Sequence, residues 1–285
     1  MGRFGGKNRR EVSMSVQNTA TYIFGSTQAE QQRLVAQAED LKHHAHYLLD
    51  QVGIQPGWNA IDVGCGPIGI LDLLSERVGR KGRVTGLEYV SRFAEMAKVE
   101  IVKRGLANVD VLEDDILSCG LPKNSFDLVH ERLVLINVPN PESLLDEMVA
   151  LARPGGTVAL EEVDNASWFC LPNHPSWDIL LKTYHSAFLA GGGDAFFGRR
   201  LPRLLRSARL EDVRYKVHAA IVDLCGHRRK HLVGLLDSLH DKVISLGLLT
   251  ERELTEHKKS LARHLDDPDT IVVDKLLVQA WGRKP

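Results

Sequence analysis

The stretch Asn59-Ala-Ile-Asp-Val-Gly-Cys-Gly-Pro-Ile-Gly69 decides the fold class. A short apolar run ends at Val63, and glycines follow at positions 64, 66 and 69. This pattern is typical of a buried strand that enters a tight turn and then a helix, with the glycines allowing the backbone to approach a ligand. Taken alone, the G-x-G-x-x-G spacing is a weak signal that also fits dinucleotide sites.

The same strand-to-helix rhythm continues outward from this loop. Apolar runs of five to eight residues alternate with amphipathic stretches of ten to fifteen, which favours a mainly parallel sheet covered by helices on both faces. We therefore predict a doubly wound, Rossmann-like α/β fold of about seven strands. Strands are expected at 58–64, 83–90, 109–116, 126–135, 157–163, near 213–223 and at 270–282, and helices at 70–79, 91–105, 141–152 and 199–208.

Helical segments flank and interrupt this core. Residues 1–16 read as a flexible basic arm and 17–56 as an N-terminal helical cap or lid, with a helix over 17–52 that stops at Gly53. The core is expected at 57–164 and resumes over 199–285, with two helices inserted at about 227–265. Exposed apolar residues in the arm predict packing on a second subunit, and hence a homo-oligomer.

An aromatic-rich segment at 165–198 separates the two parts of the core. It follows the fifth strand, where substrates of open α/β sheets bind, so we expect a lid that encloses a bulky apolar molecule. The predicted substrate-binding residues are Trp168, Phe169, Trp177, Tyr184, Phe188 and Phe196.

Composition narrows the function classes. The 285 residues are 44% hydrophobic and 26% charged with a net charge of −1, which excludes a disordered chain and disfavours nucleic acid as a partner. No apolar run approaches the roughly 20 residues that span a bilayer. The four cysteines are scattered, which predicts neither a zinc site nor a disulfide framework and fits a cytoplasmic protein with reduced thiols.

Carboxylates stand at the ends of the predicted strands. Asp62 lies two residues before Gly64, where a fixed negative charge would repel a pyrophosphate and would suit a ligand that carries positive charge. Glu88 follows Gly64 by 24 residues, where a carboxylate can accept both hydroxyls of a ribose, although this spacing alone fits NAD equally well. Asp115 ends the third strand.

Together with Phe126-Asp127 and Pro154-Gly155-Gly156, these residues resemble the class I S-adenosylmethionine-dependent methyltransferases over residues 58–164. The resemblance implies that Gly64 and Gly66 admit the methionine end of S-adenosylmethionine and that Glu88 holds the ribose. Asp115 and the backbone of Ile116 would meet the adenine, and Asp62 would help orient the loop and the ammonium. The predicted cofactor-binding residues are Tyr22, Asp62, Gly64, Gly66, Glu88, Tyr89, Asp115, Ile116 and Glu131, and S-adenosylhomocysteine would be the product.

The opening Tyr22-Ile-Phe-Gly-Ser26 resembles a subgroup that modifies small molecules in natural-product pathways. The resemblance implies that Tyr22 folds over the cofactor, and it favours carbon methylation of a prenylated indole or terpenoid that could initiate a cyclisation. The candidate catalytic residues are Tyr22, His130 and Glu162, the last two as bases at the carboxyl ends of strands four and five. Transfer to oxygen or nitrogen, an NAD-dependent oxidoreductase and a non-catalytic cofactor-binding protein remain as alternatives.

Overall fold

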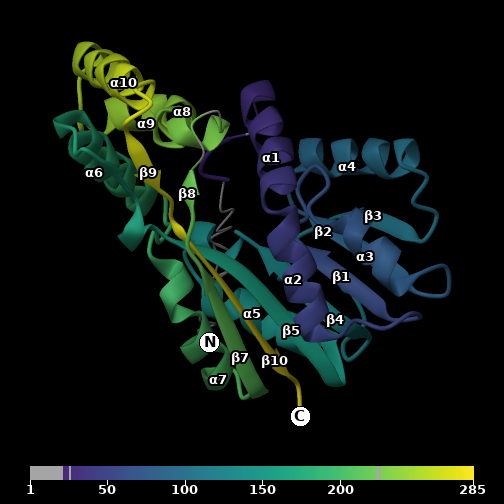
Figure 1. The fold of residues 1–285 in the computed structure, drawn as a ribbon. Coiled ribbons are helices and arrows are strands. Elements are labelled where there is room, and N and C mark those ends of the chain that lie inside the picture. Colours follow the sequence, from purple (N-terminus) through teal and green to yellow (C-terminus); the bar gives the residue numbers. More distant parts are fainter. Residues whose placement is uncertain (1–21, 26, 223, 225) are drawn as a thin grey trace, which may run out of the picture.

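The computed structural model describes residues 22–25, 27–222, 224 and 226–285, and the fold is a seven-stranded sheet with helices on both faces (Figure 1). The strand order is β3-β2-β1-β4-β5-β10-β7, so β1 lies between β2 and β4. The strands that follow β1 in the chain lie first on one side of it, as β2 and β3, and then on the other side, as β4 and β5. The strands are β1 (Asn59–Val63), β2 (Arg83–Glu88), β3 (Val109–Glu113), β4 (Phe126–Arg132), β5 (Ala152–Asp164), β7 (Glu211–His218) and β10 (Leu276–Arg283). The predicted fold class is confirmed.

Alternating side chains along the central strands separate two cores. Ala60, Leu128 and Ala159 pack with the helices on one face, and their chain neighbours Ile61 and Leu160 pack on the other. The first face carries α2 (Lys42–Val52), α3 (Leu71–Val78) and α4 (Ser91–Lys103), and the second carries α5 (Pro141–Leu151) and α7 (Leu201–Ser207). Burial of both faces explains why the strand sequences are almost continuously apolar.

The two predicted helical insertions form a single layer. The helices α6 (Pro175–Ala190), α8 (His231–Ser238), α9 (His240–Ser245) and α10 (Glu251–Leu265) pack together above one end of the sheet (Figure 1). A small sheet of β6 (Phe169–Leu171), β9 (Ile271–Val273) and β8 (Ile221–Val222) joins this layer to the main sheet. Short 3₁₀ turns occur at Leu135–Asn137, Asn165–Ser167, Phe197–Arg200 and His227–Lys230.

The N-terminal prediction needs correction in its boundaries. The helix does not run through residues 17–52: α1 (Gln28–Asp40) begins after Thr27, whose hydroxyl accepts a hydrogen bond from the Glu30 backbone amide, and α2 follows after a break at Leu41. Gly53 ends α2 in the left-handed conformation, as predicted. The arm at 1–16 and the oligomer contact inferred from it lie outside the described residues.

Three strand predictions also need correction. β5 already begins at Ala152, and Gly155 and Gly156 lie inside it where the register against β4 shifts, so the Pro-Gly-Gly sequence forms a bulge and not a turn before the strand. The predicted strand at 270–282 divides into β9 and β10, which belong to different sheets, and that near 213–223 divides into β7 and β8. β10 runs antiparallel to both of its neighbours.

Within the described residues, none of the helices combines the length and the apolar composition that crossing a bilayer requires.

Candidate active site

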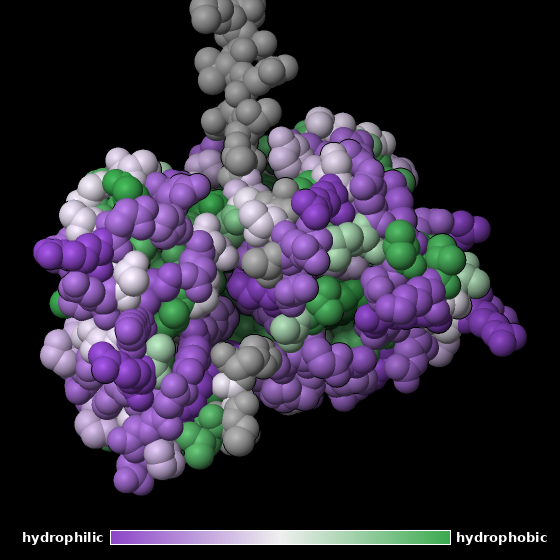
Figure 2. All heavy atoms as spheres, turned by 90° about the horizontal axis from the view of Figure 1, so that it is seen from above, coloured by the Kyte–Doolittle hydropathy of each residue, from purple (hydrophilic) through white to green (hydrophobic). Residues whose placement is uncertain are grey.

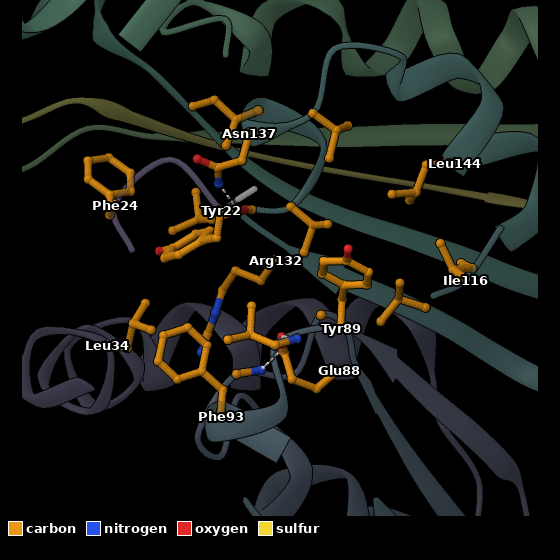
Figure 3. Close-up of a pocket in the computed structure, with 18 of the residues that line it drawn as sticks. Tyr22, Phe24, Leu34, Glu88, Tyr89, Phe93, Ile116, Arg132, Asn137 and Leu144 are labelled. Carbon is orange, nitrogen blue, oxygen red and sulfur yellow. Dashed lines mark hydrogen bonds between the residues drawn. The ribbon is translucent and has the colours of Figure 1, made fainter. Parts of the chain in front are cut away.

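A cavity of about 730 Å³ opens at the carboxyl ends of β1 to β4, under the helical layer. It lies where β1 adjoins both β2 and β4, which is the position at which open α/β sheets bind ligands. Viewed from above, this face of the molecule is hollowed between two lobes, and apolar residues are visible in the hollow (Figure 2). Figure 3 shows apolar and aromatic side chains on both sides of the space, with Glu88 between them.

The glycine-rich loop leaves room for a ligand beside β1. Gly64 has a φ of 67°, which L side chains rarely adopt, and an added Cβ would clash with the Cγ2 atom of Val134. Gly69 has a φ of 51°, and a Cβ there would clash with the carboxylate of Asp62. Both positions therefore require glycine, because a larger residue would collide with Val134 at position 64 or with Asp62 at position 69.

Glu88 connects two loops at the floor of the cavity. One carboxylate oxygen accepts a hydrogen bond of 2.8 Å from the Gly66 amide, and the other accepts one of 2.8 Å from the Val90 amide. Burial raises the pKa of Glu88, and this effect outweighs the two hydrogen bonds, which lower the pKa. Each oxygen keeps a lone pair, so the group can still accept hydrogen bonds from the hydroxyls of a ribose.

The next strand supplies the adjoining wall. Asp114, Asp115, Ile116 and Tyr89 all line the cavity, as the sequence predicted for three of them. The Asp115 carboxylate accepts a hydrogen bond of 3.0 Å from the Leu117 amide, and Ile116 is buried. A carboxylate can accept a hydrogen bond from the amino edge of a purine, and an apolar side chain beside it can pack against the face of the ring.

Asp62 and His130 lie beneath the cavity and do not line it. The His130 ring is completely buried, with Nδ1 2.7 Å from a carboxylate oxygen of Asp62 and Nε2 3.1 Å from one of Glu161. Burial opposes protonation of the ring, but the two carboxylates outweigh it and raise the pKa of His130 to about 9. Asp62 also accepts a hydrogen bond from the Ile70 amide, and so it fixes the glycine loop.

The assignment of His130 as a base for the acceptor does not fit this arrangement, since both ring nitrogens are held by carboxylates away from the cavity. The predicted contact of Asp62 with the ammonium of the cofactor does not fit either. What the structure supports is the other part of that prediction, the orientation of the loop.

Glu131 and Glu162 form a second buried pair below the segment that follows β4. Glu131 accepts a hydrogen bond of 3.0 Å from the Val134 amide, and Glu162 accepts one of 2.9 Å from the Ile136 amide. Burial raises the pKa of Glu131 to about 7, and burial together with the charge of Glu131 raises that of Glu162 well above its usual range. Neither lines the cavity. Their geometry is that of positioning residues, which corrects the assignment of Glu162 as a base and of Glu131 as a cofactor contact.

Tyr22 lies in the cavity wall, as the sequence predicted. Its hydroxyl donates a hydrogen bond of 2.8 Å to Glu30, which is fully buried and also accepts two hydrogen bonds from Arg33. Its ring packs edge-on against Phe24 and Phe93. Burial and the Glu30 charge raise the pKa of Tyr22 far above its usual range, so the hydroxyl acts as a donor and stays protonated.

The aromatic segment contributes less to the cavity than predicted. Tyr184 and Phe188, on one face of α6, line it. Trp168 and Trp177 are buried against each other in the hydrophobic core, and Phe169 and Phe196 are 42% and 37% exposed. These four do not line the cavity. Trp168, Phe169 and Phe196 lie outside α6, and Trp177 lies near the start of α6, about two turns before Tyr184, where it packs on Trp168.

Several lining residues were not predicted. Phe24 and Phe93 complete the aromatic wall, and Arg132, Asn137 and Lys275 add polar groups. One guanidinium nitrogen of Arg132, Nη1, has no hydrogen-bond partner in the described structure, while Nη2 contacts the Gly69 carbonyl oxygen at 3.4 Å. Phe93 could have been found from the sequence, since it lies in the first turn of a helix that follows an acidic strand end. Lys275 offered no such signal.

Among the described residues, no group of three or more histidine, cysteine, aspartate or glutamate side chains is arranged to hold an ion.

Residues 54–186 match the family model described as a methyltransferase domain. The match covers a little less than half of the chain. It contains the glycine loop, Glu88 and the strand ends that form the floor of the cavity. The class I S-adenosylmethionine-dependent methyltransferase domain that the sequence predicts over residues 58–164 lies within this match.

Curated relatives match over a similar length of the chain. A demethylmenaquinone methyltransferase of Listeria monocytogenes is 30% identical over 131 residues, which cover 46% of this chain and 53% of the relative. One of Geobacillus stearothermophilus is 35% identical over 115 residues, covering 40% of this chain and 49% of the relative. The chain thus spans about half the length of the curated relatives that it matches.

Solved structures resemble the whole fold at low sequence identity. A phosphoethanolamine N-methyltransferase of Haemonchus contortus in complex with S-adenosyl-L-methionine has a TM-score of 0.53 at 18% identity, over 85% of this chain and 52% of that one. A geranyl diphosphate methyltransferase has a TM-score of 0.51 at 17% identity, over 86% of this chain and 79% of that one. At such identities the likeness concerns the fold alone.

Proposed function

We propose that this protein is an S-adenosylmethionine-dependent methyltransferase that acts on a hydrophobic small molecule. The observation that carries the proposal is the carboxylate of Glu88, which is fixed by two backbone amides at the floor of a largely apolar cavity inside a methyltransferase domain. The cavity volume falls within the roughly 300 to 1000 Å³ of small-molecule sites.

The residues present fit the cofactor at each of its parts. Glu88 fits the ribose, Asp115 and Ile116 fit the adenine, and Gly64 and Gly66 line the cavity where the methionine end would lie. The unpartnered Nη1 of Arg132, beside the glycine loop, fits the carboxylate of the methionine end. When bound, the cofactor supplies an already activated methyl group, so this chain needs to align the acceptor and exclude water.

We further propose that the acceptor atom is carbon, as in the methyltransferase of the teleocidin pathway, which methylates a terpene side chain on an indole alkaloid and thereby starts its cyclisation. Rings of Tyr22, Phe24, Phe93, Tyr184 and Phe188 surround the cavity and suit a transient positive charge on an alkene acceptor. The bases predicted from the sequence lie outside the cavity, which supports carbon over oxygen or nitrogen.

The proposal includes a cytoplasmic location and the absence of a nucleic-acid partner. Cys65, Cys119 and Cys170 are free thiols, which suits a reducing compartment. The net charge of −1 offers no general attraction to phosphate backbones.

Binding of the cofactor product tests the proposed function directly. S-adenosylhomocysteine at about 100 times its dissociation constant should stabilise the folded state by roughly 2.7 kcal/mol, because a ligand that binds only the folded state shifts the unfolding equilibrium. NAD at the same concentration should leave the melting temperature unchanged. A thermal-shift assay that shows stabilisation by NAD and none by S-adenosylhomocysteine would refute the methyltransferase proposal.

The aromatic wall can be tested with matched variants. Phe188→Ala should lower methyl transfer at least about tenfold, equivalent to about 1.4 kcal/mol, because it removes a ring that shapes the acceptor space. Phe196→Ala, in the same segment but outside the cavity, should retain the unaltered rate. The measurement is single-turnover transfer of a labelled methyl group to a panel of prenylated indoles, terpenoids and quinones. Equal losses in both variants would contradict the assignment of Phe188 to the acceptor site.

A further inference from the structure

Lys275 is a buried cation in the cavity wall that neither the sequence motifs nor the cofactor accounts for. It is only 8% exposed and precedes β10, whose first residue pairs with Asp164 at the end of β5, so it lies at the same edge of the sheet as the cavity. The ammonium nitrogen lies 4.6 Å from the centre of the Trp168 ring, and this cation–π contact holds it in place.

The acidic groups around Lys275 are engaged elsewhere. Asp274 accepts a hydrogen bond from the Lys275 backbone amide with one oxygen and pairs with Arg228 through the other. Glu30 is held by Tyr22 and Arg33. Across the described part of the chain, no carboxylate lies within ion-pairing distance of the Lys275 ammonium, although such a pairing is the usual compensation for burying a charge.

The cationic character extends into a side cavity of about 160 Å³. Six residues line both cavities, and they are Arg33, Gln37, Leu133, Val163, His231 and Lys275. Arg228 and Lys230 also line the smaller one, where they pair with Asp274 and Asp266, and Asp40 adds a carboxylate. The cofactor end of the large cavity has the opposite character, since it carries Glu88, Asp114 and Asp115. The site is thus acidic toward the cofactor, and at the side cavity Lys275 is the cation for which the described residues provide no carboxylate partner.

We propose that Lys275 binds an anionic oxygen, a carboxylate or a phosphate, on the part of the hydrophobic acceptor that points away from the cofactor. This inference rests on the proposed function, and it narrows the acceptor to amphiphilic molecules with an apolar body and one acidic end. Such an anion supplies the missing counter-charge and enters the side cavity beside Lys275.

The titration of Lys275 agrees with a binding role. Burial, together with the positive charges of Arg228 and Arg33, outweighs the opposing charge of Asp274 and lowers the pKa of Lys275 to about 8. The group is therefore mostly an ammonium ion at neutral pH, and an anion bound beside it would raise the pKa again. An ammonium ion donates hydrogen bonds and cannot accept a proton, so this residue recognises the acceptor and does not act as its base.

Three ligands with one prenyl chain test the proposal: geranic acid, geranyl phosphate and geraniol. Calorimetry in the presence of saturating S-adenosylhomocysteine should show that the acid or the phosphate binds at least about tenfold more tightly than the alcohol. Preference for the acid alone or the phosphate alone supports the proposal and identifies the anion. Equal affinities, including no binding of all three up to millimolar concentration, would overturn it.

Substitutions then assign the preference to Lys275. Lys275→Met should abolish it and Lys275→Arg should retain it, whereas Lys182→Met, at an exposed lysine of α6 outside the cavity, should leave it unchanged. Lys275→Gln provides a second neutral variant if the methionine variant unfolds. Retention of the preference in a folded neutral variant would overturn the assignment. Titration of each protein with S-adenosylhomocysteine separates the two proposals, because failure to bind it contradicts the proposed function itself.

Discussion

Glu88→Ala is expected to weaken binding of S-adenosylhomocysteine by about 1.5 to 3 kcal/mol, or roughly ten- to more than a hundredfold in the dissociation constant. The variant removes the acceptor for the ribose, and it also leaves the Gly66 and Val90 amides without the partner that fixes both loops. Isothermal calorimetry of the purified variant measures the loss.

The control is Glu113→Ala. Glu113 lies directly beside Glu88 in the register of β2 and β3, but it is exposed and does not line the cavity. It should bind S-adenosylhomocysteine with unaltered affinity. Unchanged affinity in Glu88→Ala would mean that another group holds the ribose, and a comparable loss in both variants would point to a general effect of charge at this edge of the sheet.

The free energy of unfolding is expected to fall by about 3 kcal/mol between pH 6.5 and pH 9 through His130 alone. The folded-state pKa of this histidine is raised to about 9, against about 6.5 in the unfolded chain. A raised pKa means that the folded state binds the proton more tightly, so the stabilisation is complete below pH 6.5 and disappears as the pH rises through 9. Urea unfolding at a series of pH values measures this slope.

A comparison of variants isolates the histidine. His130→Gln cannot titrate and should lose this part of the slope, whereas His43→Gln, at an exposed histidine of α2, should keep it. Glu131, whose pKa is raised to about 7, adds a separate loss of stability between about pH 4.5 and 7 that both variants retain. If His130→Gln shows the same slope as the unaltered protein above pH 7, His130 is not a buried cation.

Asp62, His130 and Glu161 form a buried charged network, and its role differs from the one that the sequence suggested for His130. His130 and Asp62 stand at adjacent positions of β4 and β1, and Glu161 on β5 completes a row across the sheet beneath the cavity. The row joins the glycine loop to the outer strands, since Gln279 of β10 donates a hydrogen bond of 2.6 Å to Glu161. We infer that these charged groups hold the floor of the site in place and take no part in the transfer.

The sequence predicted only in part which residues of the aromatic segment at 165–198 line the cavity. Its composition predicted six substrate-binding residues, and two of them, Tyr184 and Phe188, line the cavity. Composition does not record which way a side chain faces. It also does not record the position along a helix. Trp177 and Tyr184 share a face of α6 about two turns apart, and Trp177 packs on Trp168 in the core whereas Tyr184 reaches the cavity.

The local pattern of the sequence by itself determined the sheet, the glycine loop and the acidic strand ends. These features depend on residues close together in the chain: the alternation of buried side chains, the backbone freedom at Gly64, and the spacing that brings Glu88 to the end of β2. Only the tertiary structure decided which polar groups reach the cavity. Asp62 and His130 are 68 residues apart and compensate each other's charge below it, whereas Lys275 enters it just before β10 and has no carboxylate partner among the described residues. The physical reason is that the cost of burying a charge depends on partners brought from distant strands, and neither spacing nor composition specifies those partners.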